Sequence, residues 1–135
     1  MLTDKNISVI HNILVEVFPT LSAWYLYGSQ LSGNANKKSD IDIAFLASEA
    51  VDNVYRLEVQ EKLAQKLNKD IDLVNLADCS EVMCFQIING GERIYCKDKK
   101  EVESFEDKAY WHYLDLQELR KGILDDAKAT GQIYG

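Results

Sequence analysis

Two short motifs in the first third of the chain carry the residues best suited to chemistry. Gly28 and Ser29 form the first motif, and ten residues later Asp40, Ile41 and Asp42 form the second. Side chains two apart on a strand point to the same face, so the two aspartates would lie together there. A pair of carboxylates can hold Mg²⁺, because this ion prefers oxygen ligands. The motifs therefore predict a site that handles phosphate with a divalent metal.

Nucleotidyl transfer is the reaction that such a site would support. A hydroxyl attacks the α-phosphorus of a nucleoside triphosphate, and two Mg²⁺ ions roughly 3.5 to 4 Å apart clamp the attacking and leaving oxygens. Glycine at 28 allows close backbone approach, and Ser29 can donate to the terminal phosphates. A third carboxylate would bind metal or accept the proton of the attacking hydroxyl. Asp70 and Asp72 are the candidates, and strand alternation does not decide between them.

The hydrophobic pattern predicts the elements that must position these residues. Strands bounded by turn signals are expected at 23–27, 40–46, 70–76 and 92–96. Helices with apolar residues at helical spacing are expected at about 3–18, 51–68, 80–88 and 100–129. The mixture predicts an α+β fold, with a small mixed β-sheet of about four strands, packed helices and a long C-terminal helix.

The pattern also predicts which faces are buried. In the second strand, Asp40, Asp42 and Ala44 should form a polar face opposite an apolar one, as in a sheet with one face on a core. In the second helix, the side chains expected to point inward are Val54, Leu57, Leu63, Ala64 and Leu67.

The last helix is predicted to carry one apolar stripe from Val102 to Ala127. Its aromatic residues Tyr110, Trp111 and Tyr113 lie on more than one helical face. Two interpretations remain open for them: ordinary packing within the domain, or a surface for a partner.

Length and charge limit the classes of function. A chain of 135 residues suits one domain over 1–135, with a hydrophobic core. Its net charge of −7 repels polyanions, so we expect no direct binding of long nucleic acids. No apolar run approaches the roughly 18 residues of a membrane helix, and no signal-peptide pattern is seen, so we expect no membrane association and a cytoplasmic location. The three cysteines and two histidines are not spaced as a disulfide framework or a zinc site.

The segment GSQLSGNANKKSDIDIAFL resembles the signature of the DNA polymerase beta-like nucleotidyltransferase superfamily, in its minimal nucleotidyltransferase branch. The likeness is most specific over about 25–76, and it implies a single minimal nucleotidyltransferase domain. It also implies that Gly28 and Ser29 bind the triphosphate of ATP, and that Asp40, Asp42 and a third acid are catalytic and hold two Mg²⁺ ions. The setting of that third acid in the family, within a pattern like IDLVNL, favours Asp72 over Asp70.

Domains of this size resemble the MntA-type antitoxins of HEPN/MNT toxin–antitoxin pairs. In that family AMP passes from ATP to a tyrosine hydroxyl of a HEPN-domain ribonuclease toxin, which is thereby inactivated. The resemblance implies a protein adenylyltransferase acting as antitoxin in a type VII-like pair, with this toxin as partner. Two alternatives stay open: an antitoxin that acts by stoichiometric binding without catalysis, and a nucleotidyltransferase for a small hydroxylated molecule such as an antibiotic.

Overall fold

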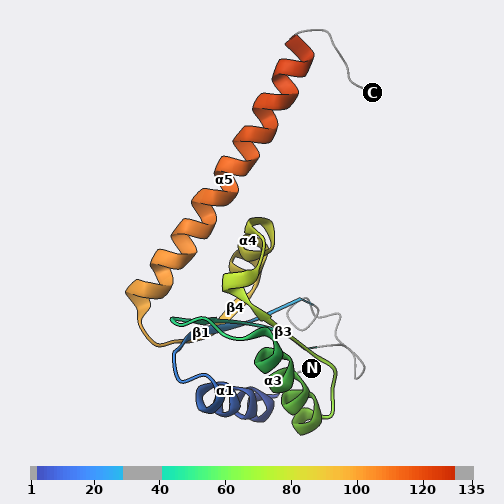
Figure 1. Ribbon diagram of the computed structural model, residues 1–135, viewed down its shortest axis with the longest axis vertical. Coiled ribbons are helices and arrows are strands. Elements are labelled where there is room, and N and C mark those ends of the chain that lie inside the picture. The colour runs from blue at the N-terminus through green and yellow to red at the C-terminus, as the bar shows by residue number, and fades with distance from the viewer. Residues whose placement is uncertain (1–2, 29–40, 130–135) are drawn as a thin grey trace.

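The computed structural model describes residues 3–28 and 41–129, the last seven of them as backbone only. Its helices and strands carry the labels of Figure 1. In chain order they are α1 (Asp4–Val17), β1 (Leu21–Tyr27), β2 (Ile41–Ala47), α3 (Asn53–Leu67), β3 (Ile71–Asn75), the 3₁₀ helix η1 (Leu76–Asp78), α4 (Glu81–Gly90), β4 (Glu92–Cys96) and α5 (Lys99–Ala129).

Capping side chains set where the helices begin. Thr3 accepts a hydrogen bond from the backbone N–H of Asn6 at 3.1 Å and so caps α1. Asp52 and Ser80 cap α3 and α4 in the same way, and Asp98 accepts from the first backbone N–H groups of α5. Each cap satisfies a donor that the helix itself leaves unpaired. The helix starts predicted from the sequence are therefore confirmed to within a few residues.

The strands form one mixed sheet in the order β3-β2-β1-β4. β1 is antiparallel to both β2 and β4, whereas β2 and β3 are parallel. A parallel pair needs a long crossover connection, and α3 supplies it. The predicted α+β class, with a small mixed sheet and a long C-terminal helix, is confirmed.

Helices cover both faces of the sheet (Figure 1). α1 and α3 pack on the face that carries Ile43 and Phe45. α4 and the first part of α5 pack on the opposite face, over Ala44 and Leu46. The prediction that β2 has one apolar and one polar face was therefore wrong beyond Asp42, because Ala44 and Leu46 are buried in a second core.

α3 faces the sheet through a narrower stripe than the sequence predicts. Val59 and Leu63 are buried, and Ala64 and Leu67 pack against the same core. Val54 and Leu57, which were expected to point inward, are 62% and 46% exposed, so that part of the prediction was wrong. The physical reason is that α3 contacts β3 through the polar side chains of Arg56 and Gln60, so apolar side chains are not needed on that side.

Two side chains of α3 satisfy the open edge of β3. The Arg56 guanidinium donates to the backbone carbonyl of Leu73 at 2.6 Å, and the Leu73 N–H donates to Gln60 Oε1 at 2.9 Å. β3 is an edge strand, so these groups have no strand partner on that side. The two hydrogen bonds hold β3 in place and protect its edge from pairing with another chain.

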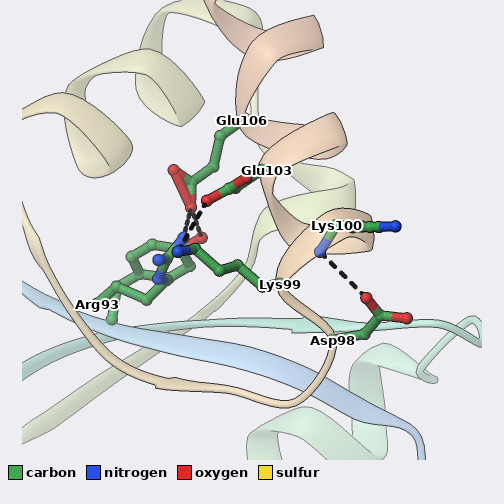
Figure 2. Close-up of polar contacts among 7 residues, drawn as sticks. Arg93, Asp98, Lys99, Lys100, Glu103 and Glu106 are labelled. Atoms are coloured by element: carbon green, nitrogen blue, oxygen red, sulfur yellow. Dashed lines mark hydrogen bonds and ion pairs between the residues drawn. The ribbon is translucent and has the colours of Figure 1, made fainter.

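Polar contacts anchor the beginning of α5 to the sheet (Figure 2). The Glu106 carboxylate accepts hydrogen bonds from the Tyr25 hydroxyl at 3.0 Å and from Arg93 at 2.6 Å. Further along, the ring of Tyr113 stacks on Phe85 of α4 with centroids 3.9 Å apart.

The rest of α5 extends away from the domain (Figure 1). Val102 and Ala109 are buried, whereas Leu119 is 63% exposed. The predicted apolar stripe is thus confirmed only for the first half of α5, and the side chains of Ile123 and Ala127 lie outside the described residues. Although α5 is long, neither it nor any other described helix is apolar enough over a sufficient length to cross a membrane.

Gln60→Ala should lower the free energy of unfolding by about 1 kcal/mol, because the Leu73 N–H loses its side-chain acceptor. Urea unfolding followed by circular dichroism measures the change. Gln65→Ala is the matched control, since Gln65 is an exposed glutamine on the same helix. Equal unfolding midpoints for the two variants would contradict a role for Gln60 in holding β3.

Candidate active site

Three polar side chains lie in one row across β1, β2 and β3. The strand register pairs Tyr27 with Asp42, and Asp42 with Asp72. By strand alternation all three share the face of the sheet that carries Ala44 and Val74. Neighbouring strands are about 4.7–4.9 Å apart, so paired side chains on one face come close together. The row lies where the core beneath α4 and α5 ends.

Gly28 brings the chain directly over the carboxylate of Asp42. Its φ of +78° belongs to the left-handed region, which residues with a Cβ adopt only with strain. A Cβ at this position would overlap the Asp42 carboxylate and lie 3.1 Å from its Cγ. Glycine is therefore required twice, for the turn itself and for the close approach to Asp42.

The register distinguishes the two candidates for the third acid. Asp72 lies inside β3, directly across from Asp42. Asp70 precedes the strand, and its backbone carbonyl accepts a hydrogen bond from the Ile41 N–H at 2.9 Å. This arrangement supports Asp72 as the partner of Asp42.

An open hollow of about 290 Å³ lies beside Asp72. Arg56 and Asn53 of α3 line one part of it, and Asp78 and Cys79 line another. Asp72 itself is exposed. A reacting group can therefore reach this end of the carboxylate row from solvent.

The donor chemistry of the row fits a divalent cation. Asp42 and Asp72 offer carboxylate oxygens, which are the ligands that Mg²⁺ prefers. Within residues 3–28 and 41–129, no group of three histidine, cysteine or acidic side chains is arranged to hold a metal. Asp40 and Ser29, the other predicted site residues besides Gly28, lie outside the described residues. The described part therefore supplies two of the three carboxylates predicted as ligands.

Tyr27 is a member of the row that the sequence analysis missed. Its hydroxyl is buried, and no described group accepts its hydrogen bond. Burial raises the pKa of Tyr27 above its usual range, and the negative charges of Asp72 and Asp42 raise it further. The signal that could have found it is its place immediately before Gly28, on the same strand face as Tyr25.

Comparison with known proteins identifies the family. The family model described as polymerase beta, nucleotidyltransferase matches residues 9–100, which include both motifs and Asp72. Protein adenylyltransferase MntA of Shewanella oneidensis is 38% identical over 125 residues, which cover 93% of this chain and 89% of the relative. The chain belongs to the MntA family of polymerase beta nucleotidyltransferases.

Solved structures of this family share the fold. A crystal structure of a toxin–antitoxin with AMP-PNP matches with a TM-score of 0.80 and 36% identity, over 94% of this chain and 99% of that one. A tri-AMPylated Shewanella oneidensis HEPN toxin in complex with an MNT antitoxin matches with a TM-score of 0.75 and 36% identity, over 91% and 96%. The predicted nucleotidyltransferase fold is confirmed, and the chain is a nucleotidyltransferase enzyme.

Gly28→Ala should lower the free energy of unfolding by about 1–3 kcal/mol, because alanine is strained at this φ and its methyl group collides with Asp42. Urea unfolding measures the loss, and titration with an ATP analogue measures the expected weakening of nucleotide binding. Gly90→Ala is the control, since a Cβ there meets nothing within 4 Å. If Gly28→Ala unfolded at the wild-type midpoint, the close approach to Asp42 would be refuted.

Proposed function

We propose that this chain is an antitoxin that works as a protein adenylyltransferase. It transfers AMP from ATP to a tyrosine hydroxyl of its cognate HEPN-domain ribonuclease toxin. The observation that carries the proposal is the aligned Asp42–Asp72 pair beside the Gly28 turn, in a chain 38% identical to Protein adenylyltransferase MntA. The added phosphate inactivates the toxin, because it places charge and volume where an RNA phosphate must bind.

Each residue of the site has a role in this proposal. Asp42, Asp72 and Asp40 hold two Mg²⁺ ions, which, when bound, supply the positive charge that the reacting phosphate oxygens need. Gly28 lets the backbone approach the triphosphate, and Ser29 donates hydrogen bonds to it. Asp72, beside the open hollow, orients the tyrosine hydroxyl or accepts its proton. ATP as co-substrate is consistent with the cytoplasmic location expected from the sequence.

The exposed side of α5 from Trp111 onward is the part of the chain that we assign to toxin binding. Trp111 is 61% exposed and Leu119 is 63% exposed, although both are large and apolar. Tyr113 packs within the domain, because its ring stacks on Phe85. Packing within the domain does not explain why the large side chain of Trp111 is exposed. Exposed apolar side chains on an element that leaves the core are typical of a protein interface. Solved relatives in which a toxin and an antitoxin are crystallised together support a toxin as the partner.

The function is tested by incubating the chain with ATP, Mg²⁺ and the purified HEPN toxin and following the toxin's mass. Wild-type protein should add AMP to the toxin, and Asp72→Asn should slow the transfer at least about a hundredfold, because a metal ligand is lost. Asp70→Asn is the matched control and should transfer at close to the wild-type rate. An unchanged toxin mass under these conditions would rule out adenylylation, and a larger loss in Asp70→Asn would make Asp70 the third acid.

The same assay separates catalysis from stoichiometric inhibition. The double variant Asp40→Asn with Asp42→Asn should no longer neutralise the toxin when present in substoichiometric amounts. If it still did so, AMP transfer would not be the mechanism. Modification of a small hydroxylated molecule with the toxin left unmodified would favour the antibiotic-type alternative.

Trp111→Ala combined with Leu119→Ala should raise the dissociation constant for the toxin at least about tenfold, because large apolar anchors carry much of the free energy of binding. Calorimetric titration with the toxin measures the change. The affinity for an ATP analogue should stay the same, since both residues are exposed on α5, whereas the described site residues lie on β1, β2 and β3 or directly after β1. Unchanged toxin affinity would show that this part of α5 is not the interface.

A further inference from the structure

Two tyrosines on one face of β1 differ in how their hydroxyl groups are satisfied. The Tyr25 hydroxyl donates a hydrogen bond to Glu106 at 3.0 Å. The Tyr27 hydroxyl is buried, yet no described group accepts its hydrogen bond. Buried polar groups in native proteins almost always have a partner, and an exception calls for a specific explanation. The partner of Tyr27 is thus expected to arrive in a different state of the site.

The surroundings of Tyr27 indicate which partner this is. Its register neighbour is Asp42, and Asp72 follows in the same row. A tyrosine hydroxyl is protonated at neutral pH, so it can donate a hydrogen bond. Carboxylate oxygens are the acceptors that the row offers.

The backbone around Tyr27 keeps its side chain in the row. A Cβ at Gly91, which precedes β4, would lie 3.3 Å from the Cβ of Tyr27 and still closer to the carbonyl oxygen of Leu26. The Tyr27 ring also packs against the core beneath α4. Close packing thus fixes the Cβ of Tyr27, and the hydroxyl can form the hydrogen bond once a carboxylate oxygen comes within reach.

We propose that Tyr27 is a positioning residue of the transfer reaction, whose hydroxyl donates a hydrogen bond to the Asp42–Asp72 carboxylate pair once metal and nucleotide are bound. The proposal rests on the proposed function. A carboxylate that binds a metal through one oxygen keeps its second oxygen as an acceptor, and a donor there fixes the orientation of the ligand. Without metal, the unpaired hydroxyl is a local cost to stability, which loading of the site removes.

Tyr27→Phe and Tyr25→Phe should have opposite effects, although each removes one hydroxyl from the same face of β1. Tyr27→Phe should leave the thermal midpoint of the ligand-free protein unchanged or raise it by about 3 °C, because it removes an unsatisfied group. Tyr25→Phe should lower the midpoint by about 3 °C, because Glu106 loses a donor. Differential scanning calorimetry measures both.

The functional readouts should reverse this order. Tyr27→Phe should weaken Mg²⁺ binding to the protein loaded with AMP-PNP about 10- to 100-fold and lower kcat for AMP transfer by a similar factor. Tyr25→Phe should leave both near their wild-type values. Titration calorimetry with Mg²⁺ measures the first quantity, and toxin mass over time measures the second.

Three results would overturn the role of Tyr27: a thermal midpoint lowered as in Tyr25→Phe, wild-type affinity for Mg²⁺, or wild-type kcat in a chain that modifies the toxin. Failure of the proposed function is a separate result, in which the wild-type chain adds no AMP to the toxin. In that event the Mg²⁺ titration still decides, since weaker binding in Tyr27→Phe supports the proposal and equal binding refutes it.

Discussion

The parallel pairing of β2 with β3 is the constraint on which the site depends. It sets Asp42 directly across from Asp72, on strands that are separated in the chain by the whole of α3. A slip of one residue would turn one carboxylate to the opposite face of the sheet. The register is held from outside by α3, whose Arg56 and Gln60 bond both backbone groups of Leu73. The crossover helix thus both connects the two strands and fixes their alignment.

The site lies where two apolar cores stop covering the sheet. Ile43 and Phe45 belong to the core under α1 and α3, while Ala44 and Leu46 belong to the core under α4 and α5. Along the described part of β2 the second face becomes polar at Asp42, and the turn at Gly28 closes over that carboxylate. Carboxylates at such a boundary are held by rigid strands, yet they remain reachable from solvent. A rigid scaffold with an accessible end suits the metal-assisted transfer that we propose.

The domain is small, and its surface divides into a catalytic end and an extended helix. Glu106 anchors the start of α5 to the sheet through Tyr25 and Arg93, and the rest of the helix carries Trp111 and Leu119 into solvent. This division suits an enzyme whose acceptor is another protein, because the partner can bind one element while its tyrosine reaches another. The open hollow beside Asp72 leaves room for that hydroxyl.

The sequence by itself determined the helices and strands, the α+β class and the two motifs that contain Gly28 and Asp42. Caps, turns and short motifs depend on residues that are close together in the chain. Strand alternation alone could not separate Asp70 from Asp72, since both lie on one side of a strand, whereas the register sets Asp72 across from Asp42 and leaves Asp70 before the strand. The sequence analysis misjudged Val54 and Leu57, because periodicity does not show which stripe of a helix meets the sheet. Tyr27 could be recognised as part of the row only from the structure, which pairs it with Asp42 and buries its hydroxyl. These features depend on contacts between distant segments, and tertiary structure alone decides them.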